Sequence, residues 1–259
     1  PASSDPLELS AHGNGLVFSA NTATHGREPY RSDGSSAGTV RLADVEPGAG
    51  SSDPGQFVSD GSGIWFFATS SVHGREPWRS LGSPATSARV IDLEPGPGSG
   101  VDTRPGIALP GISPPGGALL FAGDDGRSGV ELFVSDGSVA GTRLLADINL
   151  AAAASRPSHL LRCGERLVFL ADDGVNGERL WSSDGTSAGT QALIAPGASA
   201  PEFWNRRAFS DGARAWFVVE DPVFGRELWV SDGTSAGTRL AVDVLAGIAE
   251  ARAFGAAHA

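Results

Sequence analysis

The sequence predicts an all-β fold, a five-bladed β-propeller with four antiparallel strands per blade and a 48-residue repeat, on three observations. The stretch "GRELWVSDGTSAGT" begins at Gly225, and a close copy, "GERLWSSDGTSAGT", begins 48 positions earlier at Gly177. Related stretches recur along the whole chain. Each unit contains four short apolar or alternating segments separated by turn residues. A period of about 40–50 residues with four strands per unit is typical of a propeller blade.

The number of blades follows from the column of the "SDG" turn. Its five positions are separated by 48, 55, 48 and 48 residues, and they are Asp33, Leu81, Asp136, Asp184 and Asp232. The longer step indicates one seven-residue insertion. We expect a single domain over residues 1–259, with blades near 5–50, 51–98, 99–153, 154–201 and 202–248 and a tail at 249–259. An open fragment of a larger propeller is the alternative.

The fourth unit illustrates the predicted strands. Its segments read "SHLLRC", "RLVFLA", "RLWSSD" and "TQALIA" in chain order. The second is apolar and rich in β-favouring residues, and the third alternates. No run at helical period is long enough to compete with this assignment.

The composition excludes several classes of function. The chain has 259 residues and a formal net charge of -11, and all 19 of its basic residues are arginine. Phosphate recognition needs a basic face, so we expect no nucleic-acid partner. No apolar run approaches the roughly 20 residues of a membrane span, so we expect no membrane insertion. The absence of lysine excludes Schiff-base chemistry and a P-loop.

Residues that recur in every blade are expected to build the blade. An active site occurs once, whereas these acids and aromatic residues recur in most units. The acids are Asp33, Asp136, Asp184, Asp232, Glu28, Glu76, Glu131 and Glu227, and the large aromatic residues include Trp78, Trp181 and Trp229. The Asp side chains suit hydrogen bonds to backbone N–H groups in the hairpin turns. Arg27, Arg75 and Arg226 are expected to pair with acids between strands or blades.

No catalytic, metal or cofactor site is predicted. The acids offer no unique pair of the kind that a glycosidase needs. His25 and His73 share a column and are expected to be solvated loop residues. The "DDG" loops at Asp124 and Asp172 lack the alternating acids of a calcium-binding loop. Cys163, the only cysteine, is expected to be a small buried apolar residue.

The stretch "ELWVSDGTSAGTRLAVDV" resembles the bacterial repeat family named for its ELWxxDGT motif. The match covers nearly the whole chain. Unit two departs from the motif at Leu81, and unit four carries Arg179 in the Glu column. The resemblance implies a secreted or surface-associated bacterial β-propeller-like protein, and it brings no assigned catalytic residues. The opening "PASSDP" would suit a mature end after signal-peptide removal, so we expect a secreted, periplasmic or cell-surface location.

Binding residues are expected where the repeat breaks. One break is the proline-rich stretch Glu94–Gly117, and another is "EFWNRR", which enters the first strand of unit five. We expect Trp204 to be an aromatic anchor and Arg206 and Arg207 to hold an acidic group. Loops after second and fourth strands share one face of a propeller, so the loops at Asp124 and Asp172 are assigned to this binding face.

Two functions are consistent with these observations. The first is a non-catalytic protein-interaction or adhesion module that binds a protein through one propeller face. The alternative is a carbohydrate-binding propeller, similar to five-bladed lectins, with sugar sites between blades. We expect no enzyme activity, because no catalytic constellation is found.

Overall fold

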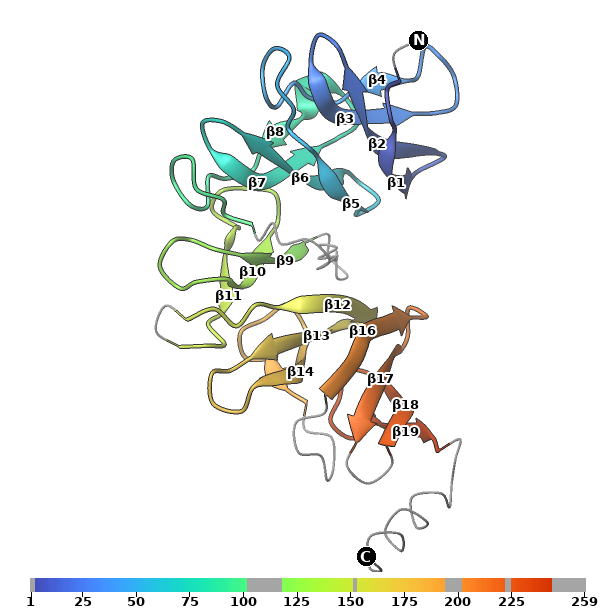
Figure 1. The fold of residues 1–259 in the computed structure, drawn as a ribbon, viewed down its shortest axis with the longest axis vertical. Helices are drawn as coiled ribbons and strands as arrows, with labels where there is room; N and C mark the ends of the chain where they lie inside the picture. The colour runs from blue at the N-terminus through green and yellow to red at the C-terminus, as the bar shows by residue number, and fades with distance from the viewer. Residues whose placement is uncertain (1–2, 102–117, 151–152, 194–201, 222–224, 244–259) are drawn as a thin grey trace, which may run out of the picture. The chain divides into compact units, whose positions relative to one another are not determined.

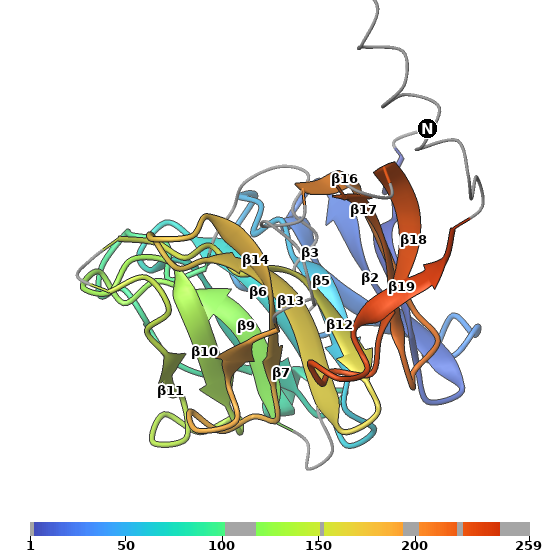
Figure 2. The same ribbon diagram turned by 90° about the horizontal axis from the view of Figure 1, so that it is seen from below.

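The computed structural model describes residues 3–101, 118–150, 153–193, 202–221 and 225–243, without the side chains of residues 202–207, 220 and 221. These residues form antiparallel β-sheets (Figures 1 and 2). The one helical segment in the described ranges is the 3-10 turn η1, Pro84–Thr86. In the same ranges no helix has the length and apolar character needed to cross a bilayer.

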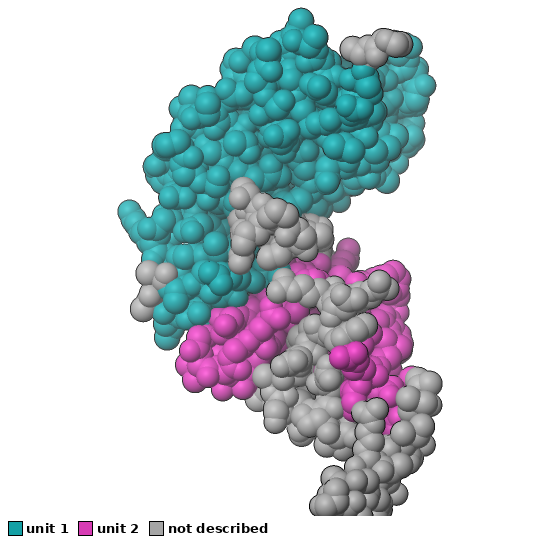
Figure 3. All heavy atoms as spheres, viewed as in Figure 1, with its two compact units in different colours: residues 1–158 teal, residues 159–259 magenta. Residues whose placement is uncertain are grey.

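The chain forms two compact units, residues 1–158 and residues 159–259 (Figure 3). Unit 1 contains three sheets. Sheet 1 consists of β1 Leu7–His12, β2 Gly15–Thr22, β3 Gly26–Ser32 and β4 Val40–Arg41. Sheet 2 consists of β5 Gly55–Ser59, β6 Ile64–Ser70, β7 Gly74–Ser80 and β8 Ala88–Arg89. Sheet 3 consists of β9 Leu119–Gly123, β10 Glu131–Ser135 and β11 Arg143–Ala146.

Unit 2 contains two further sheets, the first of which begins at the boundary between the units. Sheet 4 consists of β12 Ser158–Cys163, β13 Arg166–Asp172, β14 Glu178–Ser183 and β15 Gln191–Ala192. Sheet 5 consists of β16 Glu202–Ser210, β17 Ala215–Asp221, β18 Gly225–Ser231 and β19 Arg239–Val242. In every sheet the strands lie side by side in chain order, so each sheet is built from one continuous stretch of about one repeat.

Sheet 3 differs from the other sheets in its first strand. Three strands are described, and Val101 adds a single bridge to Gly123 ahead of them. Most of the predicted proline-rich stretch, residues 102–117, lies outside the described residues. The expected four-stranded form is therefore seen in sheets 1, 2, 4 and 5.

The core of each unit lies between successive sheets. Between sheets 1 and 2, Val17, Leu42 and Val45 meet Phe57 and Phe66. Between sheets 2 and 3, a second cluster joins Trp65 and Phe67 to residues of sheet 3 that include Phe121 and Phe133. In unit 2, sheets 4 and 5 are joined by a cluster that includes Val168, Leu170, Phe217, Val219 and Trp229. Alternation along each central strand supplies these contacts, since successive side chains point to opposite faces.

Candidate functional site

The repeated Asp side chains close the turn between the third and fourth strands. In sheet 4, Asp184 Oδ1 accepts hydrogen bonds from the Thr186 backbone N–H at 3.0 Å and the Thr186 hydroxyl at 2.6 Å. Asp33, Asp136 and Asp232 accept the same pair from the residue two positions on. These hydrogen bonds, chiefly the one from the Thr186 side chain, lower the pKa of Asp184. This is the Asp turn that the motif predicts.

The rest of the motif completes the same turn. Ser183 Oγ accepts from the Gly185 N–H at 3.0 Å and meets the Thr190 hydroxyl at 2.8 Å. A Cβ added at Gly189 would lie 2.0 Å from Asp184 Oδ1, so this position has no room for a side chain. The polar residues of "SDGTSAGT" other than Ser187 make hydrogen bonds within this turn, and they are Ser183, Asp184, Thr186 and Thr190. The recurrence of the motif therefore has a structural cause.

The second repeat makes this turn without the carboxylate. Leu81 stands in the Asp position and is 58% exposed. The chain instead forms the 3-10 turn η1, where the Ser83 backbone N–H donates to Thr86 Oγ1 at 3.2 Å. Gly82, with φ +94°, keeps the left-handed conformation of the other turns, and its N–H still donates to Ser80 Oγ. Local serine and threonine hydrogen bonds therefore replace the missing Asp.

In unit 1 the repeated Glu side chains tie the third strand of each sheet to the connection that follows its fourth strand. Glu76, in β7, is fully buried and accepts from the Leu93 N–H at 2.9 Å and the Gly100 N–H at 2.8 Å. Glu28 and Glu131 accept from the backbone at the position equivalent to Leu93 and from the hydroxyl of a serine at the position equivalent to Gly100. Glu227 is also buried. The Glu column thus fixes connecting backbone in unit 1.

Burial raises the pKa of these carboxyl groups against the pull of their hydrogen bonds. Desolvation raises the pKa of Glu76 to about 7, although the bonds from Leu93 and Gly100 favour the charged form. The pKa values of Glu28 and Glu131 are raised for the same main reason. A raised carboxyl pKa also occurs in catalytic acids, but these three side chains are buried and occupied by backbone donors.

Arg27 and Arg75, two of the arginines that precede the Glu column, donate hydrogen bonds to backbone carbonyl oxygens, and the acids Asp53 and Glu8 act on Arg75 through charge without a hydrogen-bonded ion pair. Arg27 donates to the Asp5 carbonyl oxygen at 2.7 Å, and Arg75 donates to the Asp53 carbonyl oxygen at 2.9 Å. Both side chains line a hollow of about 450 Å³ beside β1 and β5, which Glu8 also lines. A guanidinium group carries several N–H donors. The backbone carbonyl oxygens just ahead of β1 and β5 lie within reach of these donors.

The aromatic column packs across strands. Tyr30 stacks on Phe18 with ring centroids 5.8 Å apart, and Trp78 stacks on Phe66 at 6.1 Å. Phe133 and Trp229 are buried, while Trp78 and Trp181 are half-buried. The Trp181 Nε1–H donates to the Ala171 carbonyl oxygen at 3.2 Å.

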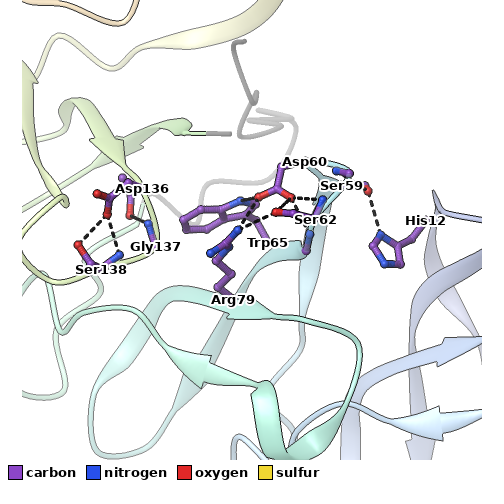
Figure 4. A network of polar contacts seen from close by, with 12 residues as sticks. His12, Ser59, Asp60, Ser62, Trp65, Arg79, Asp136, Gly137 and Ser138 are labelled. Atoms are coloured by element: carbon purple, nitrogen blue, oxygen red, sulfur yellow. Dashed lines mark hydrogen bonds and ion pairs between the residues drawn. The ribbon is translucent and has the colours of Figure 1, made fainter. Parts of the chain in front are cut away.

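A second Ser-Asp-Gly turn, between the first and second strands of sheet 2, was not predicted from the sequence. Asp60 Oδ2 accepts from Trp65 Nε1 at 2.9 Å and from Arg79 at 3.0 Å, and the Arg79 guanidinium lies over the Trp65 ring (Figure 4). Burial opposes ionisation, but hydrogen bonds from Ser62, Trp65 and the turn backbone lower the pKa of Asp60 to about 2. The same turn recurs in sheet 5, where Asp211 accepts from Trp216 Nε1 at 3.1 Å. The signal was an Asp-Gly pair followed, five residues after the Asp, by Trp.

A hollow of about 530 Å³ lies between the outer parts of sheets 1 and 2. Sheet 1 and its outgoing connection supply Val40, Arg41, Ala43 and Asp44, and sheet 2 supplies Trp78, Pro84 and Ser87. Arg41 and Asp44 form an ion pair at 2.9 Å with 28% and 35% of their side chains exposed. The volume falls within the roughly 300–1,000 Å³ of small-molecule sites. One wall is the 3-10 turn where the repeat departs from its motif.

The predicted binding residues are dispersed over several elements. Asp124 follows β9, and its Oδ1 accepts from the Gly126 N–H; Asp172 ends β13 and accepts from the Gly174 N–H. Both carboxylates therefore shape their own loops. The backbone of Trp204, Arg206 and Arg207 belongs to β16, and their side chains lie outside the described residues.

The described part of the chain contains no group of three or more His, Cys, Asp or Glu side chains placed to hold a metal ion. His73 Nδ1 lies 2.8 Å from Asp92 Oδ2, and His25 Nδ1 lies 2.8 Å from the neighbouring Thr24 hydroxyl. Cys163 is buried, and desolvation raises the pKa of its thiol to about 12. A thiol with that pKa is a poor nucleophile at neutral pH.

Comparison with known proteins yields similarity in structure but none in sequence. No protein-family model and no curated protein sequence matches the chain. It is similar to a puromycin hydrolase mutant structure (15% identity, TM-score 0.52), with 91% of this chain and 39% of that chain covered. It is also similar to TolB from Acinetobacter baumannii (16% identity, 87% and 50% covered, TM-score 0.46). A third structure is a putative TolB from Agrobacterium tumefaciens (14% identity, 88% and 78% covered, TM-score 0.48).

The likeness to the puromycin hydrolase shows a shared all-β, β-propeller-like fold and nothing about activity. This chain spans less than half the length of that protein.

Proposed function

We propose that this chain is a non-catalytic binding module, a β-propeller whose repeated residues build the scaffold and whose surface binds a protein partner. The observation that carries the proposal is the use of the repeated acids. The turn Asp side chains and the Glu side chains of unit 1 accept hydrogen bonds from their own backbone. Acids occupied in this way are not poised for proton transfer to a substrate.

We propose further that the sheets are the five blades of one propeller with a 48-residue repeat. Support comes from the spacing of the turn column, which is 48 residues in every step except one of 55, and from sheets that each use one stretch of the chain. The resemblance to the ELWxxDGT-repeat family fits this architecture. A secreted, periplasmic or surface-associated bacterial protein with an adhesion role is the biological setting that the resemblance suggests.

The proposed binding face is the one that carries the loops after second and fourth strands. Asp124 and Asp172 belong to such loops, and Trp204, Arg206 and Arg207 enter sheet 5 after one. An aromatic residue with nearby arginines is the composition that interface hot spots favour. Turns such as Ser187, between β14 and β15, belong to the opposite end of their sheet.

Two variants test the choice of face. The immobilised chain is incubated with an extract of its native source, and the retained proteins are compared between wild type, Trp204→Ala and Ser187→Arg. We expect Trp204→Ala to lose the retained partner by about tenfold or more, as hot-spot truncation does. Ser187→Arg adds a bulky charge at an exposed turn, and we expect it to retain the partner.

The reverse outcome, loss with Ser187→Arg and retention with Trp204→Ala, would place the binding surface at the other end. Turnover of a substrate by the purified chain that depends on a repeated acid would contradict the non-catalytic proposal.

A further inference from the structure

The hollow beside Trp78 combines an altered turn, an aromatic ring and an Arg–Asp ion pair of the kind that Arg89 and Asp92 form in the second repeat. The "LGSPAT" turn of sheet 2 replaces the "DGTSAG" type of turn, and it brings Pro84 and Ser87 to the wall of this hollow. The facing Arg41–Asp44 pair comes from the preceding sheet. In sheets 3 and 5, the residues equivalent to Trp78 are Phe133 and Trp229, which are buried, whereas Tyr30 in sheet 1 and Trp181 in sheet 4 are half-buried like Trp78. At this hollow the altered turn, the ion pair and the half-buried Trp78 ring lie together.

Trp78 offers one part of its ring to the hollow. It stacks on Phe66 and packs against the core cluster between sheets 1 and 2, which fixes the orientation of the indole. The ring also lines the hollow. A large planar apolar surface held in this way presents an area for stacking at little cost in conformational entropy.

The polar side of the hollow has unused hydrogen-bonding capacity. The ion pair engages Nη1 of Arg41 and Oδ1 of Asp44. Among the described residues, no recorded hydrogen bond engages Asp44 Oδ2 or the other guanidinium nitrogens of Arg41. A carboxylate oxygen accepts from a hydroxyl, and a guanidinium donates to one. The two groups are held 2.9 Å apart, so they present an acceptor beside a donor.

We propose that this hollow is a binding site for a neutral saccharide. One face of a pyranose ring carries C–H groups that would stack on Trp78, while two vicinal hydroxyls would donate to Asp44 and accept from Arg41. The two charges cancel, so the lining favours neither an anion nor a cation. This inference rests on the proposed function as a non-catalytic binding module, but not on the partner of that module being a protein.

The test uses the full chain and the methyl pyranosides of glucose, galactose, mannose and N-acetylglucosamine, followed by saturation-transfer NMR and titration. We expect at least one glycoside to bind. Asp44→Ala and Arg41→Ala should each weaken that binding by about tenfold or more, because hydrogen bonds to charged groups are the stronger ones. Trp78→Phe should weaken binding and keep the fold, since Phe occupies the equivalent position of sheet 3.

Asp147→Ala is the matched control. Asp147 occupies the column of Asp44 in the third repeat, where it is exposed and Leu144 stands in place of the arginine. Glycoside binding by this variant should equal that of the wild type. Asp44 and Arg41 are partly exposed, so their variants should keep the melting temperature of the wild type within a few degrees.

Binding of no glycoside, or binding that is unchanged in both Asp44→Ala and Arg41→Ala, overturns the proposal. Preference for sulfated or carboxylated sugars, abolished by salt, would show an anion site in its place. If no glycoside binds but Asp44→Ala still retains a protein partner, the saccharide proposal is wrong and the proposed binding module stands. Loss of that partner in Trp204→Ala with glycoside binding preserved would separate the two surfaces.

Discussion

At the residue scale, Glu76 makes the stability of the fold depend on pH. Its pKa rises from an ordinary 4.5 to about 7 because the carboxyl group is buried in β7. Between these values the folded state keeps a proton that the unfolded state has lost, so the free energy of unfolding falls as pH rises. We expect Glu76 to contribute roughly 3 kcal/mol to this fall at most. Urea denaturation between pH 4.5 and 7.5 measures it.

Glu76→Gln removes the titration and should flatten that pH dependence, while it weakens the fold at every pH because an amide N–H₂ faces a backbone donor. Part of the slope should persist, since burial raises the pKa of Glu28 and Glu131 as well. Glu165→Gln, at an exposed position between β12 and β13, is the control. An unchanged slope in Glu76→Gln would show that this carboxyl group titrates alike in both states.

At the element scale, the hairpin between β5 and β6 depends on one carboxylate. The Asp60 side chain is fully buried, and its Oδ2 receives both Trp65 Nε1 and Arg79. We expect Asp60→Ala to lower the free energy of unfolding by about 2–4 kcal/mol, because it leaves the buried Trp65 Nε1–H without an acceptor and removes the ionic partner of the partly exposed Arg79. The loss should shrink as pH falls from about 4 towards 2, where the wild-type carboxylate protonates.

Asp211→Ala provides the matched comparison in sheet 5. Asp211 makes the corresponding bond to Trp216, but it lies at an exposed turn. Its removal should cost clearly less stability than removal of Asp60. Equal losses in denaturant titrations would show that burial is not what makes the Asp60 turn important.

Elements were predictable from the sequence where the repeat displays them several times. The "SDG" column reveals a hairpin turn because Asp, Gly and the following hydroxyl recur together. The partners of Glu76 were not predictable, because Leu93 and Gly100 lie 17 and 24 positions later and contribute only backbone N–H groups. The Glu column indicates that the carboxyl group is needed. The backbone N–H groups that bind it can be identified only once the connection after β8 folds back over β7.

At the scale of the whole molecule, periodicity predicted the all-β class and the sequence-local sheets. The hollow at Trp78 could not be predicted from the sequence, since its walls come from separate repeats that meet only when sheets 1 and 2 pack. The carbonyl partners of Arg27 and Arg75 could not be predicted for a related reason, because backbone carbonyl groups are the same in every residue and the sequence does not mark them. The interpretation of Trp204 stays a prediction.

The central claim is that the repeated residues hold the scaffold together and do not contact the partner. Asp184→Ala, measured for both unfolding in urea and partner retention, tests it most directly. Loss of the bonds to Thr186 should lower the free energy of unfolding by about 1 kcal/mol and leave retention at the wild-type level. Unfolding that matches the wild type together with lost retention would contradict the account and assign the repeated acids to binding.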